Sequence, residues 1–288
     1  MNEEDLRSRD PYFNKLEELE SWFKRFAKVL VMLSGGVDST TLLAVAARVL
    51  GPERVVAITI NSPVEPPWDF EDAVKFAKEL GVKHLVVNGS NILSSEEFVA
   101  NDKLRCYYCK KSILSRVVEL ASKLGVDVIV EGSNYDDLAD YRPGLNAIRE
   151  FAPIVRSPYI ELGIGKGVIR AIAKLLGISI YDKPPSACLA TRIPHGTRIT
   201  LERLERVRDG ELFLRGLGFR VVRVRDHGDI ARIEVGVDEL GKLLEPDVRN
   251  SIANKLKSLG YKYVTVDLEG CRGTHALLRR EGRVLPNQ

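Results

Sequence analysis

Apolar residues recur along the chain in two spacings that distinguish helices from strands. Between residues 12 and 27 they recur at helical spacing and predict an amphipathic helix. Short apolar runs predict strands at 28–33, 54–60, 83–88 and 126–131. Helical segments are expected between these strands, at 39–50, 69–80 and 106–124. Strands that alternate with helices in this way predict an α/β fold with a doubly wound parallel sheet, which binds ligands at the carboxyl ends of its strands.

The pattern changes in the second half of the chain. More helices are expected over roughly 143–176, and Pro184 and Pro185 then interrupt regular structure. Beyond about residue 200, the spacing predicts helices at 200–216 and 246–259 and strands at 219–225, 230–236 and 261–268. These elements predict a smaller C-terminal α+β domain. We therefore expect two domains, at 1–183 and 184–288.

A glycine-rich motif follows the first predicted strand. Residues 34–39 read Ser-Gly-Gly-Val-Asp-Ser and precede a helical segment. A glycine turn that opens a helix presents backbone N–H groups and the positive end of the helix dipole to an anion. The motif is not a Walker A loop, because no Gly-Lys-Ser/Thr follows. It resembles the pyrophosphate loop (PP-loop) of ATP pyrophosphatases, so we expect it to bind ATP through Ser34, Gly35, Gly36, Val37, Asp38 and Ser39.

Asp38 needs its own explanation, because a carboxylate beside bound phosphates is repulsive unless a cation intervenes. We interpret it as a Mg²⁺ ligand or as a hydrogen-bond partner on the adenosine side. The alternative is an acidic residue that the helix dipole favours at a helix N-terminus.

Polar residues also follow two other predicted strands. Ser62 comes after the second strand, and the segment 131–144 follows the strand at 126–131. We expect both to face the same crevice as the PP-loop, where Ser62, Gly132 and Asn134 would bind the nucleotide. Arg142 would grip phosphate, and an aspartate pair in this segment would suit Mg²⁺. The alternative is an Asx-rich surface turn with a solvated ion pair.

The chain has four cysteines. Cys106 and Cys109 open a predicted helix, and two lysines follow, so the helix dipole and the lysines would favour thiolates. Such a pair alone is compatible with a redox dithiol, half of a zinc site, part of an iron–sulfur site or two buried thiols. Cys188 lies in an irregular, proline-flanked segment, where Arg192 would stabilise a thiolate, although a buried junction cysteine fits equally well. We interpret Cys271 as incidental.

Arg223 and Arg225 alternate with valines on a predicted strand and so point to the same face. Two arginines on one face suit a phosphate or carboxylate. The alternative is a solvated face on an edge strand.

The composition limits the partners. The 288 residues are 44% hydrophobic and carry a net charge of +3, which fits a phosphate-bearing small substrate and does not demand a nucleic acid. The chain lacks an apolar run of membrane-spanning length and a signal-peptide pattern, so we expect a cytoplasmic protein without a membrane partner. In that compartment four cysteines indicate metal binding or thiol chemistry rather than disulfides.

Five segments occur in one order and together resemble the LarE family, the ATP-dependent sulfur transferases that build the nickel-pincer nucleotide cofactor of lactate racemase. The segments are 34–39, 105–111, 131–144, 182–194 and 223–234. The two cysteine segments and the arginine segment are the more specific ones, because the PP-loop is shared by a whole superfamily. The resemblance runs from about residue 12 to 275.

The resemblance implies a reaction. In the family, a carboxylate of a pyridinium dicarboxylate mononucleotide attacks ATP, which gives an acyl-adenylate and pyrophosphate. A sulfur nucleophile then displaces AMP and leaves a thiocarboxylate. In members with one reactive cysteine, the position that matches Cys188 gives up its own sulfur. Other members add the Cys-x-x-Cys pair, and three cysteines then hold a [4Fe-4S] cluster.

This chain matches the cluster type, because it has Cys106 and Cys109 as well as Cys188. The resemblance thus implies ATP, Mg²⁺ and a [4Fe-4S] cluster as cofactors, with Cys188 and Asp38 as catalytic residues. The residues assigned to substrate binding are Arg142, Arg192, Arg223 and Arg225. Glu211 and Glu234 would lie near a divalent cation. Homo-oligomers, and transient contacts with other cofactor-biosynthesis enzymes, are expected as well.

Other functions stay open at this point. A tRNA-thiolating PP-loop enzyme would want a strongly basic surface or an RNA-binding appendage. An ammonia-dependent synthetase needs no thiol, whereas a nucleotide-binding module would use the cysteines for zinc. Within the family, a sacrificial Cys188 would leave the Cys-x-x-Cys pair structural.

Overall fold

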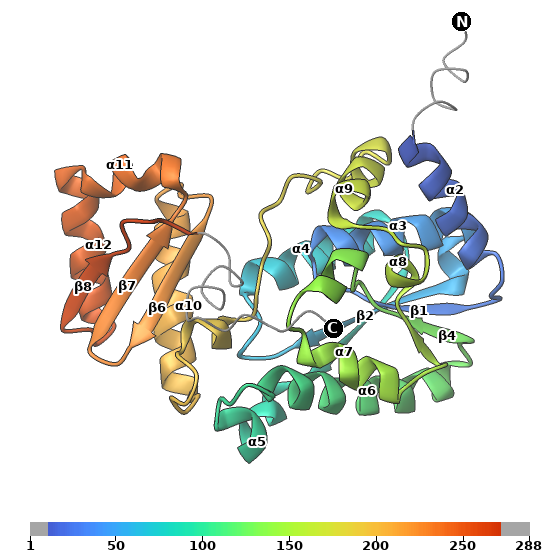
Figure 1. Ribbon diagram of the computed structural model, residues 1–288, viewed down its shortest axis with the longest axis horizontal. Helices are drawn as coiled ribbons and strands as arrows, with labels where there is room; N and C mark the ends of the chain where they lie inside the picture. The colour runs from blue at the N-terminus through green and yellow to red at the C-terminus, as the bar shows by residue number, and fades with distance from the viewer. Residues whose placement is uncertain (1–10, 272–288) are drawn as a thin grey trace, which may run out of the picture. The chain divides into compact units, whose positions relative to one another are not determined.

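The computed structural model describes residues 11–271, which form two compact units (Figure 1). Within this range, the first unit contains residues 11–62, 67–92 and 104–183. The second contains residues 184–271 together with two short segments, 63–66 and 93–103. The second unit is therefore assembled from three pieces of the chain.

The first unit is built on a five-stranded sheet. Its strands are β1 (Val29–Met32), β2 (Val55–Asn61), β3 (Lys83–Asn88), β4 (Val128–Val130) and β5 (Val155–Arg156). They lie in the order β3-β2-β1-β4-β5, and every neighbouring pair is parallel. The carboxyl ends of all five strands therefore meet at one edge, and the predicted α/β fold with a parallel sheet is confirmed.

Helices cover both faces of this sheet (Figure 1). One face packs against α2 (Pro11–Phe23), α3 (Val37–Leu50), α4 (Pro67–Glu79) and α9 (Lys166–Leu175). The other packs against α6 (Arg105–Leu124) and α7 (Pro143–Glu150). Val29 and Val31 of β1 belong to the first core, whereas Leu30 belongs to the second, because successive strand side chains point to opposite faces. Burial on both faces explains why the strand reads as a continuous apolar run.

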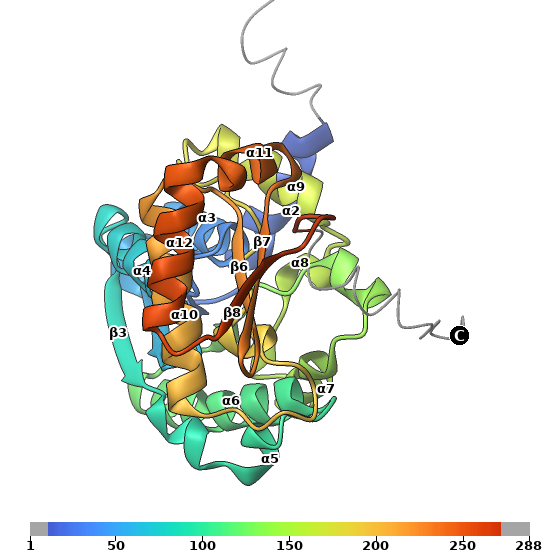
Figure 2. The ribbon, with the colours of Figure 1, turned by 90° about the vertical axis from the view of Figure 1, so that its left-hand side faces the viewer.

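The second unit contains a three-stranded sheet. Its elements are β6 (Val222–His227), β7 (Ile230–Val235), β8 (Tyr263–Val266), α10 (Leu201–Gly216), α11 (Leu240–Leu244) and α12 (Pro246–Ser258). β6 and β7 are antiparallel and β7 and β8 are parallel. Leu214 and Leu256 of the helices pack with Val224 and Ile233 of the strands into a separate core. Figure 2 shows α10 and α12 beside these strands.

Short elements complete both units. They are the helices α5 (Glu96–Val99) and α8 (Pro158–Glu161) and the 3₁₀ helices η1 (Pro52–Arg54), η2 (Ser90–Ser94), η3 (Tyr135–Ala139), η4 (Leu189–Arg192) and η5 (Val237–Glu239). The sequence pattern did not predict β5, α5 or α11, which are two to five residues long, whereas α8 lies within the helical region expected at 143–176. It also placed β6 too early, because the strand begins at Val222 and continues until His227 pairs with Ile230. Along residues 11–271, no helix combines the length and the apolar composition that crossing a bilayer requires.

Candidate functional site

The PP-loop connects β1 to α3 at the carboxyl edge of the sheet. Gly35 has a φ of +71°, and a Cβ there would lie 1.9 Å from the carbonyl oxygen of Asp69, so only glycine fits. Gly36 is the N-cap of α3 and offers no side chain to the first helical N–H groups. Ser39 Oγ accepts a hydrogen bond from the Ser34 amide at 3.1 Å and lies 3.0 Å from Ser34 Oγ. The loop is therefore a turn held by the contacts of Ser34 and Ser39, and it leads into an uncapped helix N-terminus, which suits an anion.

Asp38 lies in the first turn of α3 and contacts residues that are distant in the sequence. Lys166 Nζ, at the start of α9, lies 2.6 and 2.7 Å from the two carboxylate oxygens. Asn134 Nδ2 lies 3.4 Å from Oδ2, and the Tyr159 hydroxyl donates to the Asp38 carbonyl at 3.1 Å. Burial, with the nearby Asp38 charge, raises the pKa of Tyr159, so this hydroxyl stays protonated. Hydrogen bonds thus hold both the carboxylate and the backbone carbonyl of Asp38.

The segment that follows β4 lies against the PP-loop. A Cβ on Gly132 would lie 3.2 Å from the Ser39 amide nitrogen, so the backbones approach closely here. The Asn134 side chain accepts from the Asp136 amide at 3.1 Å, and the Asn134 amide donates to the Asp137 carboxylate at 3.0 Å. These bonds cap η3 and orient the Asn134 amide group toward Asp38. The structure therefore brings Gly132 and Asn134 together with the PP-loop.

Two other predicted site residues have different surroundings. Arg142 forms an ion pair with Asp137 at 2.7 Å, and its side chain is 44% exposed. Burial raises the pKa of Asp137. Ser62 follows the last residue of β2 and packs beside Gly89, where an added Cβ would lie 2.9 Å from Ser62 Cβ. A phosphate contact of Arg142 and a nucleotide contact of Ser62 stay predictions.

Glu131, directly after β4, is a buried carboxylate that organises this edge. Lys110 Nζ lies 3.1 Å from it, and Ser133 and Ser157 donate hydrogen bonds to it. Burial alone would raise the pKa of Glu131, but the Lys110 ammonium and the serine hydroxyls hold the pKa below its ordinary value. Glu131 is therefore an anion that ties α6 to the end of β4.

A second lysine lies behind the PP-loop. Lys183 Nζ donates to the Gly35 carbonyl oxygen at 3.0 Å. It also lies 2.7 Å from Asp69 and 2.5 Å from Asp72, both on α4. Lys183 is the last residue of the first unit, and the prolines begin directly after it. It therefore braces the loop against α4.

Cys106 lies in the first turn of α6 and is exposed, and Cys109 follows about one turn later and is half-buried. The two lysines that follow were expected to favour the thiolates. In the structure each lysine has a carboxylate partner: Lys110 contacts Glu131, and Lys111 lies 2.7 Å from Glu150. Their positive charge is thus shared with carboxylates.

Cys188 is the N-cap of η4 and is half-buried. Its carbonyl oxygen accepts hydrogen bonds from the Thr191 hydroxyl at 2.8 Å and from Arg192 at 3.1 Å. The next amide, that of Leu189, donates to the Val64 carbonyl at 2.7 Å. The irregular backbone that carries this thiol is therefore held on both sides.

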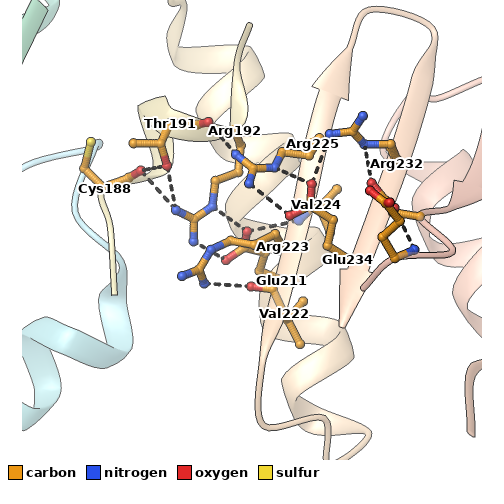
Figure 3. A network of polar contacts seen from close by, with 12 residues as sticks. Cys188, Thr191, Arg192, Glu211, Val222, Arg223, Val224, Arg225, Arg232 and Glu234 are labelled. Carbon is orange, nitrogen blue, oxygen red and sulfur yellow. Dashed lines mark hydrogen bonds and ion pairs between the residues drawn. The ribbon is translucent and has the colours of Figure 1, made fainter. Parts of the chain in front are cut away.

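Arg192 is the largest fully buried side chain among the described residues. It donates to both carboxylate oxygens of Glu211, at 2.7 and 3.0 Å, and to the Ala187 carbonyl at 2.7 Å. Burial would lower the pKa of Arg192, but Glu211 raises it. Figure 3 shows the Cys188 sulfur directed away from the guanidinium group and the Cys188 carbonyl directed toward it.

Arg223 and Arg225 lie beside this pair on β6 (Figure 3). Arg225 donates to both oxygens of Glu234 at 2.9 Å and to the Thr191 carbonyl at 2.8 Å. Arg223 donates to the carbonyls of Val222 and Pro185, each at 2.9 Å. Burial and the neighbouring guanidinium groups lower the pKa of Arg223. The alternative of a solvated strand face is wrong, because the two arginines are only 7% and 6% exposed.

Predicted metal ligands are distributed over both units. Cys106 and Cys109 belong to the first unit, and Cys188, Glu211 and Glu234 to the second. Both glutamates face guanidinium groups. Among residues 11–271, no three His, Cys, Asp or Glu side chains lie close enough together to hold a metal ion. The shared cluster, and the cation near the glutamates, stay predictions.

Sequence reasoning assigned no site role to several residues that the structure places at these sites. They are Glu131, Ser157, Tyr159, Lys166 and Lys183. Lys183 stands next to the prolines in the segment 182–194, but its contact with Gly35 spans 148 positions. Cys271 has a clearer place than expected, since its amide donates to the Val235 carbonyl at 2.7 Å.

The parallel sheet, the PP-loop and the paired Asp38 define a nucleotide-binding fold of the PP-loop ATP pyrophosphatase class. The NAD synthase family matches residues 17–107, which contain this loop. An NH₃-dependent NAD⁺ synthetase of Hyperthermus butylicus is 47% identical over 68 residues, which cover 23% of this chain and 25% of that protein.

Longer matches identify the family. The pyridinium-3,5-bisthiocarboxylic acid mononucleotide synthase of Lactiplantibacillus plantarum is 38% identical over 261 residues, 90% of this chain and 92% of that protein. An uncharacterized protein of Synechocystis is 40% identical over 257 residues, 89% of this chain and 94% of that protein. The chain belongs to the LarE family, as its motifs indicated.

Proposed function

We propose that this protein is an ATP-dependent sulfur transferase that makes a pyridinium thiocarboxylate mononucleotide for nickel-pincer cofactor biosynthesis. The observation that carries the proposal is the nearly full-length similarity to a synthase named for that product. The PP-loop geometry supports the first half-reaction, in which ATP is split to AMP and pyrophosphate. We assign ATP to the domain at 1–183 and sulfur transfer to the domain at 184–288.

In the first step, a substrate carboxylate attacks the α-phosphorus of ATP, and the bond to pyrophosphate breaks. The uncapped N-terminus of α3 and the Ser34 and Ser39 hydroxyls would hold phosphate oxygens. Mg²⁺ would bind phosphate together with Asp38, whose side chain is 21% exposed. Ser62, Gly132 and Asn134 would contact the nucleotide, and Arg142 a phosphate.

In the second step, a sulfur nucleophile attacks the acyl carbon and AMP leaves. Cys188 lies on a backbone that Arg192 and Thr191 hold in place, which would position its sulfur reproducibly. Arg223 and Arg225 would bind the phosphate of the pyridinium nucleotide. Arg192 would assist on the substrate side by ordering this segment.

The donor set fits a [4Fe-4S] cluster held by Cys106, Cys109 and Cys188. Cys106 and Cys109 are one helical turn apart, and the described cysteines form no disulfide with one another. A cluster with three thiolate ligands leaves one iron without a protein ligand, which would supply a place for a transferable sulfide. Single use of the Cys188 sulfur is the alternative. Glu211 and Glu234 would lie near a divalent cation, which would compete with Arg192 and Arg225 for their carboxylates.

The test is an anaerobic incubation of purified protein with ATP, Mg²⁺ and pyridinium-3,5-biscarboxylic acid mononucleotide. We expect AMP, pyrophosphate and a product in which sulfur has replaced oxygen. Asp38→Asn and Ser34→Ala should each lower AMP formation about 100-fold, the scale for loss of a preorganised electrostatic contact. Formation of ADP and phosphate, or thiolation of tRNA instead, would overturn the proposal. We also propose a cytoplasmic homo-oligomer that contacts other enzymes of the pathway transiently.

A further inference from the structure

Lys166 has a position that the assigned chemistry does not use. It is the first residue of α9, and its amide donates to the Asp136 carboxylate at 2.7 Å. Its side chain is 30% exposed, and its ammonium group lies 2.6 and 2.7 Å from both oxygens of Asp38. The backbone of Lys166 is therefore fixed, whereas its side chain is partly exposed to solvent.

The place of this ammonium group, beside the uncapped N-terminus of α3, points to a ligand with negative charge. Asp38 already stands at the N-terminus of α3, beside Ser34 and Ser39, where a phosphate is expected. A triphosphate that enters there is repelled by Asp38 and attracted by Lys166. Because Lys166 Nζ contacts Asp38, a rotation of the Lys166 side chain would bring Nζ to any group that binds beside Asp38.

We propose that Lys166 is a catalytic residue that releases Asp38 when ATP and Mg²⁺ bind and then contacts a phosphate oxygen of ATP. This inference rests on the proposed function. During adenylation, a bond forms between the substrate carboxylate and the α-phosphorus, and the electron pair of the broken bond leaves on pyrophosphate. An ammonium group placed beforehand at this charge stabilises the transition state without reorganising solvent.

The first test uses Lys166→Gln, Lys166→Arg and, as a matched control, Lys174→Gln near the other end of the same helix. Lys166→Gln should lower the rate of AMP and pyrophosphate formation 100- to 1,000-fold. It should also weaken ATP binding, measured by calorimetry without the pyridinium substrate, at least 10-fold. Lys166→Arg should recover part of both, and Lys174→Gln should match the wild type. Unchanged ATP binding and rate in Lys166→Gln would overturn the proposal.

A second test separates ATP contact from a purely structural support of Asp38. If Lys166 only holds Asp38, then Lys166→Gln adds nothing in an Asp38→Asn background. We expect Lys166→Gln to weaken ATP binding in that background as well. Equal ATP affinities of Asp38→Asn and of the double variant would overturn the proposal. Failure of the wild type to form AMP with the pyridinium substrate would contradict the proposed function instead, and the ATP-binding measurements would still decide the role of Lys166.

Discussion

The guanidinium group of Arg192 donates two hydrogen bonds to the carboxylate of Glu211, and both side chains are completely buried. The same guanidinium group reaches the carbonyl oxygens of Ala187 and Cys188. Glu211 also accepts a hydrogen bond from the Val224 amide at 3.0 Å. One ion pair therefore connects α10 and β6 to the segment that carries Cys188.

Removal of one partner should destabilise the second unit. Glu211→Gln leaves the buried Arg192 charge without its counter-charge, so we expect a loss of about 3–5 kcal/mol in the free energy of unfolding. The measurement is urea unfolding, with Glu202→Gln, an exposed residue on the same helix, as the control. At urea concentrations below the unfolding transition, the rate at which Cys188 is alkylated should also differ between Glu211→Gln and the wild type. A stable variant with unaltered alkylation would contradict the positioning role of this pair.

Glu131 should make stability depend on pH in the acid range. Its pKa in the folded protein lies below the ordinary value of 4.5, so the folded state binds this proton less readily than the unfolded state does. The contribution of Glu131 to stability is fully present above about pH 4.5 and is lost as the pH falls through the pKa of the folded state. Glu131→Gln should therefore show a smaller decrease in unfolding free energy between neutral pH and the acid range. Glu79→Gln, which alters an exposed residue, should follow the wild type.

Arg223 and Arg225 should respond differently to substitution, although both were expected to hold the substrate phosphate. Arg225 is engaged by Glu234, whereas the hydrogen bonds that Arg223 donates within the described chain end on carbonyl oxygens. The charge of Arg223 is thus not offset by a carboxylate hydrogen-bonded to it within the described chain, so it can attract a phosphate more strongly. Arg223→Ala should weaken binding of the pyridinium nucleotide by about 1.5–3 kcal/mol and leave ATP binding nearly unchanged.

The matching experiment compares Arg223→Ala with Arg225→Ala by calorimetry and by thermal unfolding. Arg225→Ala should lower stability more, because it leaves the buried Glu234 without its closest partner. Equal losses of affinity for ATP and for the pyridinium nucleotide would mean that the substitution had damaged the fold.

The sequence predicted those features whose signal is local. The apolar run at β1 and the glycines after it specify a buried strand and a turn, and both lie at the expected place. Period-two spacing predicted that Arg223 and Arg225 share a face. The carboxylate that meets Arg225 depends on strand register, which pairs β6 with β7 and brings Glu234 within reach.

Other contacts have no local signal. The ion pair of Lys166 and Asp38 joins positions 128 residues apart, and the contact of Lys183 with Gly35 spans 148. Lys166 stands in no pattern that distinguishes it from a surface lysine on a helix. Lys183 lies in the segment 182–194, but nothing in that segment indicates a contact with Gly35. These contacts arise only when the sheet brings the carboxyl ends of its strands together. The same reason explains why β5, with two residues, was not predicted.

The cysteines provide the last prediction. We expect anaerobically purified protein to bind iron and sulfide and to show the broad visible absorption of a [4Fe-4S] cluster. Cys106→Ala, Cys109→Ala and Cys188→Ala should each lose this absorption and multiple turnovers, because three thiolates are needed to leave one iron open. As a control, Cys271→Ala should keep both the absorption and multiple turnovers. A wild-type protein without iron that loses one H₂S from Cys188 after a single turnover would instead support the sacrificial route. In that case Cys106→Ala and Cys109→Ala should retain the single turnover, and the pair at the start of α6 would be structural.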